Sequence, residues 1–249
     1  MGTRFGVPIF VCGINLDTDI LPRVSALVLA GGQSRRMGRD KALLDFDGAP
    51  LIARVIERVR QVCAEVIVVA NDADAYARFG VRVVTDVYPG KGSLGGVFSG
   101  LQAVDTDYAL AVACDMPFLN HAVMRYLISL APEADVILPR AQDPSRNRMY
   151  STKRTVRFNL RAKEIDLHPT HAIYSKRCLA PMDERVRAGE LRLIGFLDTV
   201  RVRIVEASEF DRFDPQHLSF FNVNTPENLL LARSLSPMDK SAAVPGSVV

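Results

Sequence analysis

From Val24 onward, short apolar runs rich in β-branched residues alternate with longer stretches that repeat apolar residues at helical spacing. The short runs are typical of buried strands and the longer stretches of amphipathic helices. Strands that alternate with helices form parallel sheets through crossover connections. The alternation therefore predicts an α/β fold of Rossmann-like type, with a mostly parallel sheet and helices on both of its faces.

The pattern also divides the chain of 249 residues, of which 48% are apolar, into expected elements. Strands are expected at 24–30, 65–70, 81–86, 108–114, 134–139, 170–175 and 201–207. Helices are expected at 50–62, 72–79, 120–130 and 179–188, in a stretch that ends near Val104, and from Pro226 onward. We expect one domain over residues 24–235, an N-terminal extension over 1–23 and a disordered tail over 236–249.

Composition excludes several classes of protein. The formal net charge of +3 is too small for bulk nucleic-acid binding, and no apolar run has the length of a membrane span. The four cysteines lie far apart, without the spacing of a zinc site or a disulfide framework. We therefore expect a cytoplasmic protein with reduced thiols that binds neither nucleic acid nor membrane, and whose anionic ligands are small.

The segment "ALVLAGGQSRRMGRDKALL", residues 26–44, turns from a strand into two glycines and then four cations: Arg35, Arg36, Arg39 and Lys41. Glycines let backbone N–H groups approach a phosphate chain, and cations add charge-assisted hydrogen bonds. The segment lacks the P-loop and G-x-G-x-x-G patterns, which argues against a simple ATPase or a dehydrogenase. A solvated surface loop is the alternative reading.

Four residues fall just past expected strand ends: Gly31, Asn71, Asp86 and Asp115. Open α/β sheets bind ligands at the carboxyl ends of their strands, so these residues are expected to share one edge with the glycine-rich segment "YPGKGSLGG", residues 88–96. Asp115 lies between a strand and a proline turn, where it could hold Mg²⁺ with substrate phosphates or cap the next helix.

Five motifs occur in the order found in one known family: "LVLAGGQSRRMGRDKALL", "GSLGGVFSGL", "CDMPFL", "HPTHAIY" and "FFNVNTPENL". From about Val24 to Leu235 the chain resembles MobA-type molybdenum cofactor guanylyltransferases, whose fold is of the nucleotide-diphospho-sugar transferase type. The resemblance implies Mg²⁺-dependent transfer of GMP from GTP to molybdenum-molybdopterin, with release of pyrophosphate. Because the pterin is labile, transient contact with a molybdoenzyme or a cofactor chaperone is also expected.

By motif position, the resemblance assigns roles to individual residues. It implies that backbone groups line the nucleotide pocket at Leu29, Ala30 and Gly31. Lys41 would contact phosphate and Asp115 would bind magnesium, both as catalytic residues, while Asn71 and Asp86 would touch the nucleoside. Two further assignments stay open. Arg36 is a candidate for contact with pyrophosphate, but Arg35 could exchange roles with it. Asn224 in "NVNTPE" is either a metal or phosphate ligand or part of a helix cap.

The chain also departs from the family. Ser93 stands where the family commonly has proline, and a basic insertion at about 140–163 carries eight Lys and Arg residues against one acid. The insertion either clamps the anionic acceptor or is a solvated loop. The alternative functions are a CTP-dependent cytidylyltransferase for the same acceptor, a sugar-phosphate nucleotidyltransferase, and a nucleotide-sensing module without turnover.

Overall fold

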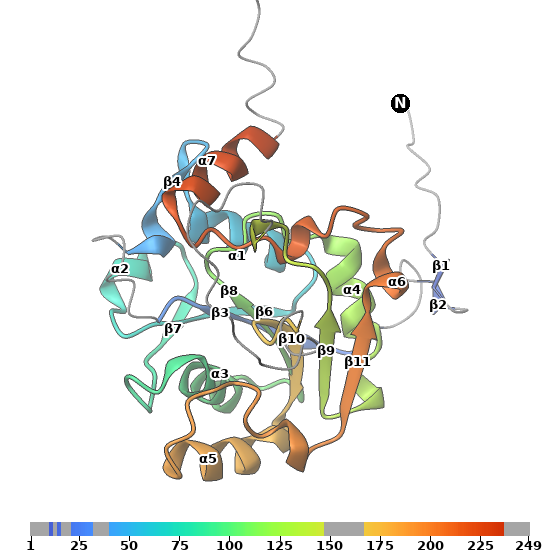
Figure 1. The fold of residues 1–249 in the computed structure, drawn as a ribbon. Helices are drawn as coiled ribbons and strands as arrows, with labels where there is room; N and C mark the ends of the chain where they lie inside the picture. Colours follow the sequence, from blue (N-terminus) through green and yellow to red (C-terminus); the bar gives the residue numbers. More distant parts are fainter. Residues whose placement is uncertain (1–9, 12–13, 16–20, 32–39, 147–166, 237–249) are drawn as a thin grey trace, which may run out of the picture.

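The computed structural model describes residues 10–11, 14–15, 21–31, 40–146 and 167–236. Its centre is a seven-stranded sheet of order β11-β9-β10-β8-β3-β6-β7 (Figure 1). The strands are β3 (Val24–Leu29), β6 (Glu65–Val69), β7 (Arg82–Val84), β8 (Tyr108–Ala113), β9 (Val136–Arg140), β10 (His171–Ser175) and β11 (Val202–Glu206). Only β10 is antiparallel to its neighbours in this sheet. The predicted mostly parallel α/β fold is confirmed.

Helices cover both faces of the sheet. They are α1 (Leu51–Arg60), α2 (Asp74–Ala77), α3 (Gly92–Ala103), α4 (His121–Ser129), α5 (Leu179–Arg187), α6 (Ala207–Phe210) and α7 (Pro226–Leu235). Because side chains alternate along a strand, β3 sends Ala26 and Val28 to the core under α1 and α4, and Leu27 to the core under α3 and α5 (Figure 1). The two clusters form two cores, one on each face of the sheet.

Short elements complete the described residues. They are the 3-10 helices η2 (Lys41–Leu43), η3 (Ala131–Glu133), η4 (Pro144–Arg146), η6 (Lys176–Cys178), η7 (Leu197–Thr199) and η8 (Leu218–Phe220). Two small ribbons pair β1 (Phe10–Val11) with β2 (Ile14–Asn15) and β4 (Asp45–Phe46) with β5 (Ala49–Pro50). The second ribbon turns at Asp47 and Gly48, both with positive φ, a turn that the Asp-Gly pair favours but that the sequence reading missed.

Within the glycine-rich segment, α3 already begins at Gly92, so several of its glycines are helical. A Cβ atom at Gly100 would lie 2.9 Å from side-chain atoms of Leu27 and Val69. The absence of side chains therefore lets α3 lie close against β3 and β6. Packing of helix on sheet, as well as access for a ligand, explains this run of glycines.

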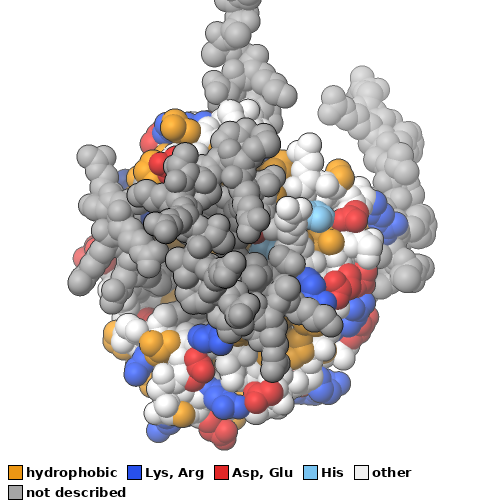
Figure 2. All heavy atoms as spheres, in the orientation of Figure 1, with side chains coloured by type: hydrophobic (Ala, Val, Ile, Leu, Met, Phe, Trp, Pro, Cys, Tyr) orange, Lys and Arg blue, Asp and Glu red, His pale blue; other side chains and the backbone are white. Residues whose placement is uncertain are grey.

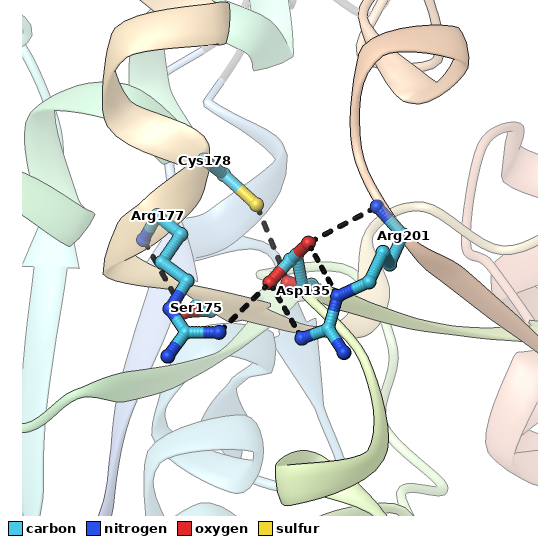
Figure 3. Close-up of polar contacts among 5 residues, drawn as sticks. All are labelled: Asp135, Ser175, Arg177, Cys178 and Arg201. Atoms are coloured by element: carbon cyan, nitrogen blue, oxygen red, sulfur yellow. Dashed lines mark hydrogen bonds and ion pairs between the residues drawn. The ribbon is translucent and has the colours of Figure 1, made fainter.

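At the amino-terminal edge of the parallel strands, Asp135 contacts residues at the ends of β10 and β11 as well as preceding β9 (Figure 3). Its carboxylate accepts hydrogen bonds from the backbone and guanidinium nitrogens of Arg201 at 3.1–3.2 Å, and it lies 3.7 Å from Arg177. Its backbone oxygen accepts from the backbone N–H of Ser175. The hydrogen bonds from Arg201 lower the pKa of Asp135 from its ordinary value.

Acidic and basic side chains intermix over the described face that carries α5 and β11 (Figure 2). Ion pairs among the described residues include Arg140–Glu206, Arg185–Asp198 and Arg203–Glu209. Among the described helices, none combines the length and the hydropathy that crossing a lipid bilayer requires. The thiols of the described cysteines, Cys63, Cys114 and Cys178, are free.

Candidate active site

A pocket of about 330 Å³ opens at the edge where β3, β6, β7 and β8 end. Its described lining residues are Leu29, Ala30, Gly31, Lys41, Val69, Asp86, Gly92, Ser93, Gly96, Ala113, Cys114, Asp115 and Thr170. The carboxyl ends of parallel strands and the start of α3 thus surround one cavity. This is the position at which open α/β sheets bind their ligands.

The structure brings together six of the seven residues singled out from the sequence as nucleotide-binding or catalytic. Those that line the pocket are Leu29, Ala30, Gly31, Lys41, Asp86 and Asp115. Asn71 follows β6 at the same edge, but it is exposed and is not one of the lining residues. The candidates Arg35, Arg36 and Arg39 lie outside the described residues, as do positions 147–166, which include most of the basic insertion.

Lys41 is held in place by its own helical turn. Asp40 caps η2, since its Oδ1 accepts a hydrogen bond of 3.0 Å from the backbone N–H of Ala42. The hydroxyl of Tyr76, a buried residue of α2, donates to the other oxygen of Asp40 at 2.5 Å. The carboxylate is thereby fixed from two sides, and with it the backbone that carries Lys41.

Three segments far apart in the sequence meet around the ammonium group of Lys41. Nζ of Lys41 donates to Oδ1 of Asn224 at 3.1 Å and lies 4.0 Å from Oδ2 of Asp115. The backbone N–H of Val223 donates to the backbone oxygen of Asp115, which links the "NVNTPE" segment to the end of β8. A cation, a carboxylate and an amide therefore share the mouth of the pocket.

Asp115 combines burial with a nearby positive charge. Its side chain is only 13% exposed, and desolvation raises its pKa from the ordinary value, while the ammonium group of Lys41 opposes the shift. Shifted carboxylates in a cleft are typical of functional sites. The alternative reading, a helix cap, does not apply, because Asn120 caps α4 by accepting from the N–H groups of Ala122 and Val123.

The donor set suits a metal that arrives with its substrate. No group of three or more His, Cys, Asp or Glu side chains in the described ranges could hold an ion by itself. Magnesium in nucleotide sites takes one or two carboxylates, phosphate oxygens and water. One partly desolvated carboxylate beside a pocket fits this pattern, and Asp115 supplies it.

The two readings of Asn224 can now be separated. Thr225 caps α7, because its Oγ1 accepts from the backbone N–H of Asn228 at 3.1 Å, and Pro226 occupies the first helical turn. A small apolar cluster that includes Phe46 and Ala232 packs α7 beside β4 (Figure 1). The side chain of Asn224 is thus not the cap of α7 and faces Lys41.

Some lining residues were missed by the sequence reading, most clearly Thr170. It directly precedes β10, whose antiparallel direction places the start of that strand at the edge where its neighbours end. Its backbone oxygen accepts a hydrogen bond from Ala113, the last residue of β8. Apolar alternation identifies a strand but not its direction, so no signal in this segment alone could have placed Thr170.

Comparison with known proteins identifies the family. A model of the MobA-like NTP transferase domain matches residues 26–200. The chain belongs to the MobA-like NTP transferase family. This MobA-like chain is 33% identical to a protein named "Probable molybdenum cofactor guanylyltransferase" from Pelotomaculum thermopropionicum, over 89% of its length and 98% of the relative's. It is 32% identical to the molybdenum cofactor guanylyltransferase of Desulfosudis oleivorans, over 83% and 92%.

Solved structures show that the fold of this MobA-like protein is shared. The molybdopterin-guanine dinucleotide biosynthesis protein A of Archaeoglobus fulgidus matches with a TM-score of 0.68 at 22% identity, over 85% of this chain and 98% of that one. The 2-C-methyl-D-erythritol 4-phosphate cytidylyltransferase of Thermus thermophilus matches with a TM-score of 0.59 at 18% identity, over 86% and 98%. The nucleotidyltransferase fold predicted from the motifs is confirmed.

Proposed function

We propose that this MobA-like NTP transferase moves GMP from GTP to molybdenum-molybdopterin, forming the guanine dinucleotide cofactor and pyrophosphate. The observation that carries the proposal is the meeting of Lys41, Asp115 and Asn224 beside a pocket lined by the glycine-containing end of β3. A cation and a metal-binding carboxylate at a strand edge suit a triphosphate. The relatives' printed names supply the choice of GTP and of the molybdenum cofactor as acceptor.

In this proposal the reacting groups are held by side chains from separate segments. The backbone of Leu29, Ala30 and Gly31 contacts the nucleotide, and Lys41 stabilises charge that accumulates on the phosphates during transfer. Asp115 would hold Mg²⁺, and the ion would supply positive charge that offsets the charge of the substrate phosphates. The terminal phosphate of the pterin attacks the α-phosphorus of GTP in line, and pyrophosphate leaves.

The nucleoside end of the substrate lies toward Asp86 and Asn71 in the same proposal. Asp86 lines the pocket from the segment after β7, and Asn71 follows the neighbouring strand β6. A carboxylate can only accept hydrogen bonds from nucleoside N–H or O–H groups. Delivery of the finished cofactor to a molybdoenzyme or a chaperone belongs to the proposal as well.

CTP is the alternative nucleotide, because a cytidylyltransferase has a similar fold. The two glycines of "LAGG" and the guanylyltransferase names of the relatives favour GTP. The deciding experiment incubates the full-length protein with each of the four NTPs, Mg²⁺ and molybdenum-loaded molybdopterin. Pyrophosphate and dinucleotide are expected with GTP. Product with CTP alone, or the absence of product with all four NTPs, would refute the proposal.

A further inference from the structure

Ser99, a buried residue of α3, is the centre of a hydrogen-bond network behind the pocket. Its Oγ accepts from the backbone N–H of Val87 at 2.9 Å and lies 2.9 Å from Oδ1 of Asp86. The backbone oxygen of Gly95 lies 2.8 Å away as a second acceptor. Because hydrogen bonds to carboxylates are the stronger kind, the hydroxyl proton goes preferentially to Asp86.

This network occupies one oxygen of Asp86. Oδ1 accepts from Ser99 and also from the backbone N–H of Tyr88, at 2.9 Å each. Within the described ranges, no protein donor is hydrogen-bonded to Oδ2. Since Asp86 lines the pocket, Oδ2 is the oxygen left for a ligand.

Close packing, as well as hydrogen bonding, restricts where the Asp86 carboxylate can lie. A Cβ atom at Gly95 would lie 3.1 Å from both Oδ1 of Asp86 and the backbone oxygen of Tyr88. The start of α3 therefore presses directly against the carboxylate and the turn that follows it. Ser99 lies one helical turn after Gly95, so the same helix supplies the close contact and the hydrogen bond.

We propose that Ser99 is a positioning residue for nucleotide binding: it fixes the Asp86 carboxylate so that Oδ2 faces the N–H or O–H donors of the bound nucleoside. Ser99 itself is buried behind the carboxylate and is not one of the residues that line the pocket. The inference rests on the proposed nucleotide-binding function and adds to it a residue that controls affinity and not the chemical step.

The test measures GTP affinity by calorimetry and steady-state kinetics on the full-length protein. Ser99→Ala is expected to raise the Kd and KM for GTP roughly tenfold, the equivalent of one charge-assisted hydrogen bond, with kcat within about twofold of wild type. In an Asp86→Ala background the same substitution should cause no further loss of affinity. If Ser99 served stability alone, the effect of Ser99→Ala would not depend on whether Asp86 is present.

Ser25→Ala is the matched control, because Ser25 is equally buried, receives a hydrogen bond of 2.9 Å from Thr106 and lies at the amino-terminal edge of the sheet. It should lose stability without losing affinity. Ser99→Cys, which fills the site with a slightly larger group and a weaker hydrogen-bond donor, serves if Ser99→Ala does not fold. Wild-type protein that binds no GTP would refute the proposed function. If the wild-type protein binds GTP and the Ser99 variants bind it with an unchanged Kd, the role of Ser99 is refuted and the proposed function is not.

Discussion

The Nζ atom of Lys41 lies 3.1 Å from Oδ1 of Asn224, although 183 positions separate the two residues in the chain. Asn224 is a neutral partner, so its hydrogen bond orients the ammonium group without offsetting its charge. The nearby carboxylate of Asp115 is 4.0 Å away, beyond hydrogen-bond distance. Lys41 is therefore fixed in position by a neutral amide, with Asp115 as a longer-range ion-pair partner, at the point where the proposed function places the phosphates of the nucleotide.

Substitution of Asn224 separates orientation of Lys41 from ligand binding. Asn224→Ala should raise the KM for GTP roughly tenfold through loss of one hydrogen bond to a charged group. Asn224→Asp should weaken GTP binding further, because a carboxylate there pairs with Lys41 and offsets its charge. Steady-state kinetics check both variants, and an Asp variant with wild-type activity would instead favour Asn224 as a metal ligand.

Asp115→Asn should abolish turnover and at the same time raise the unfolding temperature. Burial raises the pKa of Asp115, so the ionised form is less stable in the fold than in the unfolded chain, and this cost persists at every pH above its folded pKa. The isosteric amide removes the charge without leaving a cavity. Calorimetric unfolding and the pyrophosphate assay measure the two effects; a variant with wild-type rates at ordinary Mg²⁺ would contradict the metal role.

Tyr76→Phe should weaken GTP binding through Asp40, since it deletes the hydroxyl that holds the carboxylate capping η2. We expect a severalfold increase in KM and a loss of about 1 kcal/mol in the free energy of unfolding. Tyr126→Phe is the control, because its hydroxyl also donates to a carboxylate, that of Glu209. Equal KM values in the two variants would show that Asp40 does not position Lys41.

Two glycines of α3 should respond oppositely to alanine. At Gly100 the new methyl group would lie 2.9 Å from Leu27 and Val69, so Gly100→Ala should destabilise the protein by about 1–3 kcal/mol. At Gly96 the nearest atom is 3.6 Å away, in Leu29, so Gly96→Ala should stabilise it by up to about 1 kcal/mol through helix propensity. Denaturant unfolding distinguishes them, and equal midpoints would contradict the close approach of α3 to the sheet.

Stability should decrease with acid through His171. Burial, with a contribution from His168, lowers the pKa of His171 to about 3. Below the unfolded-state pKa of about 6.5, the unfolded chain binds a proton that the folded chain does not, which costs about 2 kcal/mol at pH 5. His171→Phe should flatten this loss between pH 7 and pH 5. An unchanged pH dependence of urea unfolding in the variant would exclude His171 as its source.

The sequence was informative where local chemistry decides structure. Apolar alternation predicted the strands of the central sheet to within a few residues. Of the four residues expected just past strand ends, three line the pocket, Gly31, Asp86 and Asp115, whereas the other lining candidates were assigned by motif position from the family resemblance. The Asp47-Gly48 turn could have been read in the same way, because only a few residue types tolerate its backbone angles.

Contacts between distant segments could not be predicted in this way. The position of Thr170 depends on the antiparallel direction of β10, and the partner of Lys41 comes from the far end of the chain. Ser99 shows a third limit, because a serine inside an apolar helix has no distinguishing pattern until the acidic residue that it contacts is placed opposite it. Tertiary packing decides all three.

The antiparallel direction of β10 affects how easily the connection between β9 and β10 can change in length. β9 ends and β10 begins at the same edge of the sheet, where Arg140 and Leu167 form an isolated β-bridge. Nε2 of His168 is also hydrogen-bonded to the backbone oxygen of Ala141 there. The entropic cost of closing a connection between two such anchors grows only with the logarithm of its length. Evolution can therefore lengthen or shorten the connection between these strands with little loss of stability, and each change begins and ends at the edge of the sheet that carries the pocket.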